Sequence, residues 1–503
     1  MKKIYLSLML LLGLFCSCSM DKAPYGSLDE TTAIQSMNDL TRLRNGVYTR
    51  LRSMTSGSWV TYSDIQMDQY HGLTSNGNRV GNFSNGLINS SQGDIEGFFS
   101  GCYSVIANMN YLIEQCDKLA ATTEEGVDQI LIARYKAEAC FARAYAYFYL
   151  IDHFCQPYKK VDPTTEHSGV QIVTKYEPTG DITKYPSRST LAESYKLVED
   201  DLEAAYNGLK AFEAADNGMI SPNAAYLNSY AVAAMQARVA LVKGDYVTAK
   251  KKADEVINSG KYALTEIADY AKLWSEDEGT EVIFRPYMSN VEGLSSTGEA
   301  YTLSSSETSA DYIATTATLN LYDENDARFD AIFKVWQLDI EGTQVYSYVF
   351  QKYPGNAALR TTAENNYMNM PKPFRLSEMY LVAAEAAARD NKDASPYLNA
   401  LMAKRIAGYI NANYPASTVM DVIKVERQRE LLGEGFRMSD LRRWGEGFKR
   451  DGAHLENPGL DPFIVAAGAN LGYEADDYRF TWPIPKTEMD SNPNLAGQQN
   501  PGY

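Results

Sequence analysis

The sequence predicts a mainly α-helical protein: a tetratricopeptide-like solenoid of about four helical hairpins, with irregular loop insertions and short β insertions. Apolar residues recur with the helical period over long stretches, and short turns join some of these stretches in pairs. Two intervals, 55–93 and 275–370, lack this period and are rich in glycine, serine, asparagine or tyrosine. We expect one domain over 34–503, with helical repeats within about 128–260 and 375–445.

The N-terminus predicts export and lipidation. Two lysines precede an apolar run over 4–15, which is shorter than the roughly 20 residues that a membrane-spanning helix needs. A serine then precedes Cys18, the expected lipidation site, whereas Cys16 follows a bulky phenylalanine. We therefore expect a signal peptide over 1–17 and a lipidated tether over 18–33, so that the membrane is contacted only through the lipid.

The first helices are predicted by single apolar faces. Leu40, Leu43, Val47 and Leu51 share one face of a helix over about 33–54. The interval 55–93 is expected to be irregular and solvent-facing, because glycine, serine and asparagine dominate it. Later helices are expected over about 94–119, 126–154 and 188–209. The helix over 188–209 is expected to pair with residues 134–150 of the preceding helix.

The clearest hairpin signal is a helix of small residues, 223–242, followed by the turn Gly244-Asp245 and a returning helix over 246–258. The other helical units and the short strands are expected, in chain order, at 281–287 and 345–353 (strands), 375–389 with 394–407, and 418–445.

The cysteines leave two alternatives open. Cys102 and Cys116 are expected on one helix, about 21 Å apart, and Cys140 and Cys155 are separated in the same way. A disulfide between Cys102 and Cys140 is compatible with an antiparallel helix pair in an exported protein. The alternative is that all four are free buried thiols.

Composition excludes several function classes. The formal net charge of −17 disfavours binding to nucleic acid or to anionic lipid. The four histidines are scattered, and the acidic run Asp323–Asp326 lacks the glycine and the final glutamate of an EF-hand loop. No phosphate-binding glycine loop and no Gly-x-Ser-x-Gly nucleophile motif occurs. We therefore expect a binding protein without catalytic residues, metal or cofactor.

Four stretches together resemble the SusD/RagB family of nutrient-binding lipoproteins. They are AEACFARAYAYF at 137–148, RLSEMYL with AEA at 375–386, ERQREL and EG followed by DLRRW at 426–444, and WPIPKTEM with the ending QNPGY at 482–503. The segment at Phe98-Phe99 departs from the family, whose members often have tryptophan there. The resemblance implies four tetratricopeptide-like units and a protein that is anchored in the outer membrane and faces the cell exterior. It also implies a partner, a SusC-like TonB-dependent transporter.

Several motif residues are better explained by architecture than by chemistry. The charged residues of 426–444 are expected to tie adjacent helices through arginine–carboxylate pairs. Glu138 and Glu378 could be a glycosidase acid/base pair, but interhelical hydrogen bonding is the better account. Trp444 and Trp482 are expected to pack, and the Pro-Ile-Pro turn is expected to dock the C-terminus on the solenoid.

The candidate ligand contacts are aromatic and amide side chains on the two irregular intervals, because sugars bind to aromatic faces flanked by hydrogen-bonding groups. They are Trp59, Tyr62, Tyr70, His71, Asn78, Phe83, Tyr287, Trp336 and Tyr346.

The expected function is capture of a nutrient, an oligosaccharide first and a peptide as the alternative ligand, for delivery to the transporter. Two hypotheses from other classes are a lipid-anchored glycoside hydrolase and an adhesin scaffold, since helical repeats often bind proteins.

Overall fold

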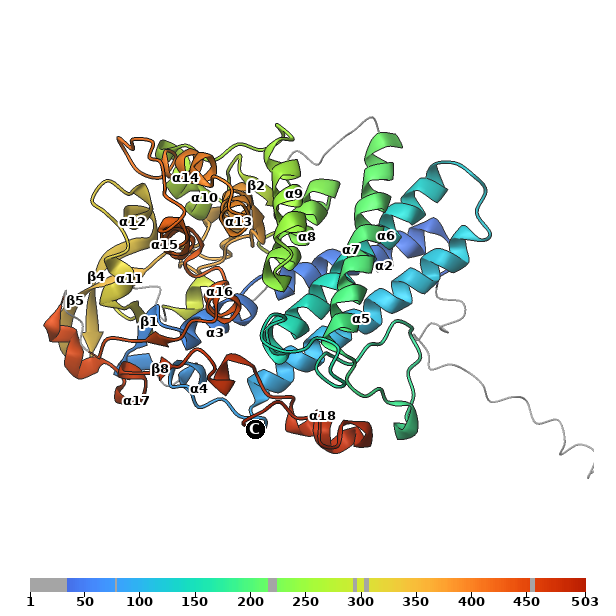
Figure 1. Cartoon of the computed structure of the whole chain (residues 1–503), viewed down its shortest axis with the longest axis horizontal. Coiled ribbons are helices and arrows are strands. Elements are labelled where there is room, and N and C mark those ends of the chain that lie inside the picture. The colour runs from blue at the N-terminus through green and yellow to red at the C-terminus, as the bar shows by residue number, and fades with distance from the viewer. Residues whose placement is uncertain (1–33, 77–78, 216–223, 293–295, 303–306, 453–456) are drawn as a thin grey trace, which may run out of the picture.

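Long helices form most of the chain in the computed structural model, which describes residues 34–503 except 77–78, 216–223, 293–295, 303–306 and 453–456. The N-terminal helices are α2 (Met37–Met54), α5 (Gly93–Ala120), α6 (Val127–Phe154), α7 (Leu191–Ala215), α8 (Ser229–Lys243) and α9 (Tyr246–Ile257). From α5 to α9 each helix packs against the next, and α9 packs against α13 (Leu376–Arg389). The mainly α class and the pairing of α6 with α7 are confirmed; the likeness of each hairpin to a tetratricopeptide unit stays a prediction. Figure 1 shows α5–α7 and the hairpin β4–β5 towards opposite ends of the molecule.

Local signals set the helix ends. The Asn228 side chain accepts the Ala231 N–H at the start of α8, and Gly244 ends it with φ +83°. The predicted hairpin of α8 and α9 is therefore confirmed, although α8 begins at Ser229 and not at the predicted 223. Helices α6 and α7 can approach closely because Gly208 has no side chain. A Cβ added at Gly208 would lie 2.7 Å from the Ala137 Cβ.

The later helical units are α13 with α14 (Ser395–Met402), then α15 (Val419–Leu431) and α16 (Arg437–Trp444). Helix α14 ends before the predicted 407, because the Arg405 carbonyl instead accepts the Ala327 N–H. Gly433 and Gly435, at φ +72° and +83°, separate α15 from α16. Shorter helices are α10 (Tyr270–Ser275), α11 (Thr316–Leu319), α12 (Ala327–Ile332), α17 (Ala466–Ala469) and α18 (Lys486–Ser491).

The prediction that 55–93 faces solvent is wrong. This interval forms α3 (Ser58–Gln66), β1 (Tyr70–Gly72) and α4 (Gly81–Ser84), and much of it is buried. Burial is possible because Arg450 donates to the carbonyls of Ile65, Gln66 and Met67 at 2.7 to 3.1 Å. The buried guanidinium thus supplies the hydrogen bonds that water would otherwise donate to these backbone carbonyls.

The strands form one main sheet of order β1-β3-β5-β4. Strands β4 (Phe333–Ile340) and β5 (Thr343–Phe350) form a hairpin, and β3 (Tyr312–Ala314) pairs with both β5 and β1. The predicted strands correspond to β5 and β2 (Val282–Phe284), whereas β4 was not predicted. Two short pairs complete the strands: β2 with β6 (Phe374–Arg375), and β7 (Phe448–Lys449) with β8 (Gly472–Tyr473).

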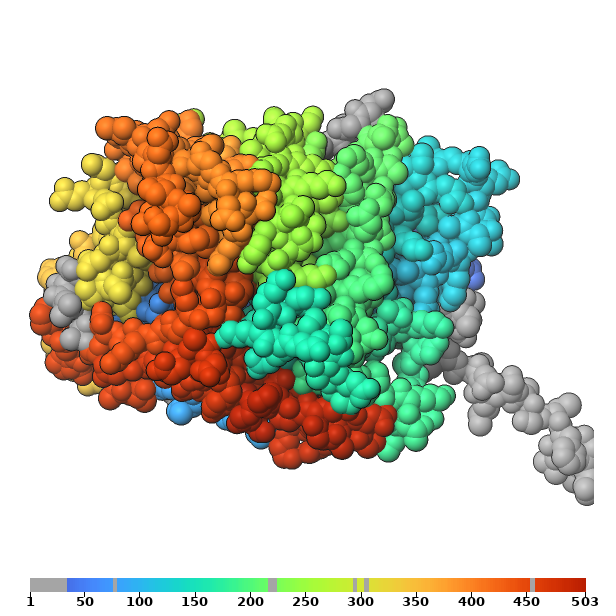
Figure 2. Space-filling model, viewed as in Figure 1, coloured from blue at the N-terminus to red at the C-terminus, as the bar shows by residue number. Residues whose placement is uncertain are grey.

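The C-terminal segment docks on the helices, as predicted. The Trp482 side chain is fully buried, and its Nε1 donates to Gln66 at 2.9 Å. Asn500 donates to the Phe154 and Trp482 carbonyls at 2.8 and 2.7 Å. Arg188 donates in turn to the Asn500 side chain at 2.9 Å. Figure 2 shows the C-terminal residues, in red, along one edge of the molecule.

Cys102, Cys116, Cys140 and Cys155 are free and buried, so the Cys102–Cys140 disulfide is absent from the structure. Within the described residues, no helix combines the length and apolarity needed to cross a membrane. Cys18, with the predicted signal peptide and tether, lies outside the described residues.

Candidate functional site

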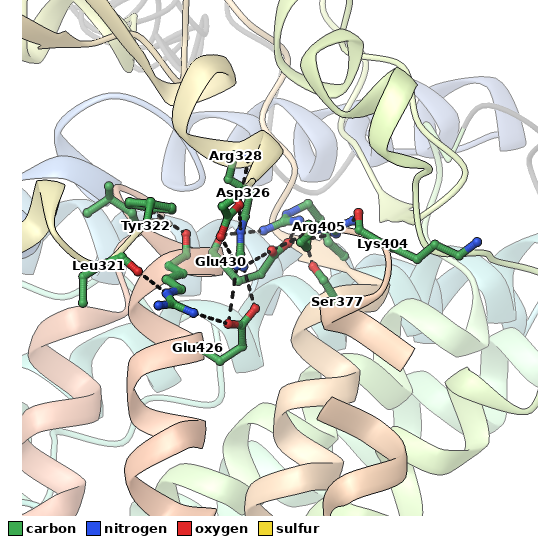
Figure 3. Close-up of polar contacts among 12 residues, drawn as sticks. Leu321, Tyr322, Asp326, Arg328, Ser377, Lys404, Arg405, Glu426 and Glu430 are labelled. Carbon is green, nitrogen blue, oxygen red and sulfur yellow. Dashed lines mark hydrogen bonds and ion pairs between the residues drawn. The ribbon is translucent and has the colours of Figure 1, made fainter. Parts of the chain in front are cut away.

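The charged motif at 426–444 contributes to a buried ion cluster (Figure 3). The Glu430 carboxylate accepts hydrogen bonds from Arg328, Arg375 and Arg405 at 2.8 to 3.1 Å. Arg328 also donates to Glu426 at 2.6 Å. Burial alone would raise the pKa of Glu430, but the guanidinium groups of Arg405, Arg375 and Arg328 outweigh it and hold that pKa well below its usual range. The architectural interpretation of these charges is confirmed.

The two carboxylates considered as an acid/base pair each bind an arginine of another helix. Arg44 of α2 donates to Glu138 of α6 at 2.7 Å. Arg238 of α8 donates to Glu378 of α13 at 2.6 and 2.7 Å. Interhelical bonding therefore accounts for both side chains.

The acidic run considered for calcium is also engaged by protein groups. The Asp326 carboxylate accepts from Arg328 at 2.7 and 2.9 Å. Across the described ranges, no group of three or more histidine, cysteine or acidic side chains is arranged to hold a metal ion.

Several predicted ligand contacts lie in the core instead of at the surface. Tyr70, His71, Phe83 and Trp336 are at most 6% exposed, so they offer no face to a ligand in this structure. Trp336 points inward because it alternates along β4 with exposed neighbours. The strand period thus places it on the inner face, which the irregular composition of the interval did not reveal.

The remaining candidates divide into three places. Trp59 and Tyr62 are half-buried and pack edge-on against Phe98, at 5.1 and 5.7 Å between ring centroids. Tyr287 is exposed beside α2, where Arg52 donates to its carbonyl. Tyr346 is exposed on β5, and Asn78 lies outside the described residues.

The outer face of the β4–β5 hairpin brings together aromatic, amide and carboxylate side chains. The three cross-strand pairs on this face, called the hairpin face below, are Val335 with Tyr348, Gln337 with Tyr346, and Asp339 with Gln344. Tyr346 is 61% exposed and Tyr348 is 38% exposed. Phe329 braces the Tyr348 ring edge-on, with 5.2 Å between the centroids. Two tyrosine rings, two amides and a carboxylate therefore lie on one surface of a hydrogen-bonded sheet.

A polar pair lies next to the same sheet. Arg79, just before α4, pairs with Asp311, just before β3, and also donates to the Glu299 carbonyl at 2.8 Å. Burial raises the pKa of Asp311 to about 6, against the opposing charge of Arg79. The Asp339 N–H at the end of β4 donates to the Thr308 carbonyl at 2.9 Å, which connects the hairpin to this segment.

The sheet brings together the two intervals from which ligand contacts were predicted. Strand β1 comes from 55–93, and β3, β4 and β5 come from 275–370. Tyr346 was a predicted contact. Arg79, Gln337, Gln344 and Asp339 were not among the predicted contacts, although the alternation of polar and apolar residues from Trp336 to Ile340 could have indicated the hairpin's outer face.

Comparison with known proteins matches two family models to most of the chain. The model described as "SusD family" matches residues 337–503, which include most of the hairpin. The model described as "Starch-binding associating with outer membrane" matches residues 20–241. The chain belongs to the SusD family.

Individual relatives agree with this assignment. The starch-binding protein SusD of Bacteroides thetaiotaomicron is 32% identical over 131 residues, which are 26% of this chain and 21% of that protein. The match therefore spans only about a fifth of the curated relative.

Solved structures match almost throughout. A SusD superfamily protein of B. thetaiotaomicron has a TM-score of 0.77 at 28% identity, covering 93% of this chain and all of the other. A candidate sugar-binding protein of Bacteroides vulgatus has a TM-score of 0.76 at 28% identity, covering 94% of this chain and all of the other. The SusD-like fold therefore extends across both family-model matches and the region between them.

Proposed function

We propose that this SusD-like protein binds an oligosaccharide on the hairpin face without altering it chemically. The observation that carries the proposal is the exposed pair Tyr346 and Tyr348, flanked by Gln337 and Gln344 on a rigid sheet. A sugar ring presents a C–H patch to an aromatic face and hydroxyls to amide and carboxylate groups around it. The starch-binding and sugar-binding descriptions of relatives support the same ligand class.

Catalysis is not part of the proposal. The carboxylates of Glu138 and Glu378 are occupied by arginines of other helices, which leaves each tied to an ion pair. A glycosidase needs two carboxylates free to face a scissile bond.

The test compares two exposed tyrosines. A glycan-array screen first identifies the oligosaccharide that binds best. Tyr346→Ala should weaken the binding of this oligosaccharide by about tenfold, equivalent to about 1.4 kcal/mol. Tyr226→Ala, at an exposed tyrosine that is not among the candidate ligand contacts, is the matched control and should bind as the unmodified protein does. Equal binding by both variants, or array binding to peptides and not to glycans, would contradict the proposal.

We propose further that lipid on Cys18 anchors the protein on the outer face of the outer membrane, where it delivers the glycan to a SusC-like TonB-dependent transporter. The family description supports association with the outer membrane. Cys18→Ala should release the protein from the membrane fraction, and the lipidated protein should co-purify with a TonB-dependent barrel. Retention of the variant in the membrane, or co-purification with another surface protein in place of the barrel, would contradict this part.

A further inference from the structure

A groove lies on the irregular segment between α6 and α7, which is remote in sequence from the hairpin face. It has a volume of about 750 Å³ and is lined by residues 172–179 and 184–186 together with Ala107 of α5. This volume lies within the range of small-molecule sites, roughly 300–1,000 Å³, and would hold about two or three sugar rings. The hairpin face uses none of these residues.

Buried polar groups hold one wall of the groove. The Asn110 side chain of α5 donates to the carbonyls of Val173 and Lys175 at 2.9 and 3.2 Å. The Tyr147 hydroxyl of α6 donates to the Val173 carbonyl at 2.8 Å and accepts the Val173 N–H at 2.7 Å. Asn110 is fully buried, and its side-chain oxygen accepts a hydrogen bond from Arg143 at 2.8 Å, so this wall is fixed from beneath.

The C-terminal segment holds the opposite wall. Asn494 donates to the Tyr185 carbonyl at 2.6 Å, and Asn492 donates to the Pro186 carbonyl at 3.0 Å. Figure 1 and Figure 2 show the segment between α6 and α7, which lines the groove, next to α18. An exposed, largely irregular segment is thus immobilised on both sides of a hollow, which is the arrangement expected of a binding loop on a rigid scaffold.

The side chains in the groove have a distinct chemistry. Tyr176 and Tyr185 are half-buried, and the Tyr176 ring is braced edge-on by Tyr111 at 5.1 Å between centroids. Lys175 and Lys184 are exposed, and neither ammonium forms an ion pair within the described part of the chain. The exposed carboxylate of Glu177 also lines the groove, so its three charged side chains together carry one net positive charge. In a protein with a formal net charge of −17, this local excess of positive charge beside two tyrosines favours a ligand that carries negative charge.

We propose that this groove is a second carbohydrate site, specific for an acidic oligosaccharide whose uronate carboxylate lies between Lys175 and Lys184 while its rings lie against Tyr176 and Tyr185. The inference rests on the proposed function as a glycan-binding protein, and it adds a charge requirement at a separate place.

The test measures tri-galacturonate binding to the mature protein by isothermal titration calorimetry. Lys175→Gln/Lys184→Gln should weaken tri-galacturonate binding at least tenfold and remove its dependence on salt concentration. The matched control, Lys196→Gln/Lys392→Gln, removes two lysines whose side chains are 70% and 62% exposed and which pair with aspartates elsewhere. It should bind tri-galacturonate like the unmodified protein.

The outcomes separate the two proposals. Tri-galacturonate binding that survives in the Lys175/Lys184 double variant, or that is absent from the unmodified protein, would overturn the second site. Neither result affects the hairpin face, which is judged by Tyr346→Ala. Loss of tri-galacturonate binding in Tyr346→Ala, with the groove variant unchanged, would assign acidic glycans to the hairpin and also overturn the inference.

Discussion

Replacing Glu430 by glutamine tests whether the ion cluster is a structural element of the fold. The carboxylate accepts four hydrogen bonds from three buried arginines, at 2.8 to 3.1 Å (Figure 3). Glutamine keeps the shape and one acceptor oxygen, but it removes the negative charge and turns an N–H₂ towards guanidinium groups. Breaking a buried pair from one side leaves an uncompensated charge, so we expect a loss of about 3–5 kcal/mol in the free energy of unfolding.

Urea unfolding followed by tryptophan fluorescence measures this loss. Asp200→Asn is the matched control, because its pair with Lys196 has side chains that are 62% and 70% exposed, and it should cost less than about 1 kcal/mol. Glu430→Gln should also keep glycan binding below its unfolding transition, since the residue lies in the ion cluster and not on the hairpin. A variant as stable as Asp200→Asn, or a folded variant without glycan binding, would refute the reasoning.

Three further predictions concern acid stability, helix packing and thiol chemistry. Burial would raise the pKa of Glu385, but Arg443 outweighs it and lowers that pKa to about 2. The resulting stabilisation is therefore present above about pH 4.5 and lost as the pH falls towards 2, so Glu385→Gln should flatten the pH dependence of unfolding in that window; an unchanged profile would contradict the assignment. Gly208→Ala should destabilise by about 1–3 kcal/mol because its Cβ would lie 2.7 Å from the Ala137 Cβ, whereas Gly97→Ala, with nothing within 4 Å, should be neutral or slightly stabilising in the same thermal melt. The four buried cysteine thiols should not react with a thiol reagent until the protein unfolds, and rapid labelling of any of these four in the native protein would show that it is accessible.

The helices could be predicted because their signals are local. The turn at Gly244 marks the end of α8 in the sequence itself, and Gly244 acts in the structure as the cap residue. The predicted start at 223 was too early, because the Asn228 side chain caps the helix that begins at Ser229. The hairpin β4–β5 was half predicted: β5 was expected, and β4 was hidden inside an interval classified by its composition. The inward position of Trp336 follows from strand period, which only becomes visible once β4 is recognised.

Burial of the interval 55–93 could not be predicted from its own residues. Its composition is that of a surface loop, and its backbone carbonyls would need water at a surface. Arg450, remote in sequence, satisfies those carbonyls instead and itself becomes 2% exposed. A contact over such a separation leaves no signal in the neighbouring sequence.

The sequence by itself determined the family, the helical class, the architectural role of the charged motifs and the docking of the C-terminus. These depend on periodicity, caps and motifs that lie within short stretches. Tertiary structure alone decided which aromatic side chains reach the surface. Strand β1 meets β3 only after residues about 240 positions apart are paired, and Tyr70 of β1 is enclosed in the assembled structure. The pairing of β4 with β5 places Tyr346 on the outer face, while Trp336 lies on the inner face.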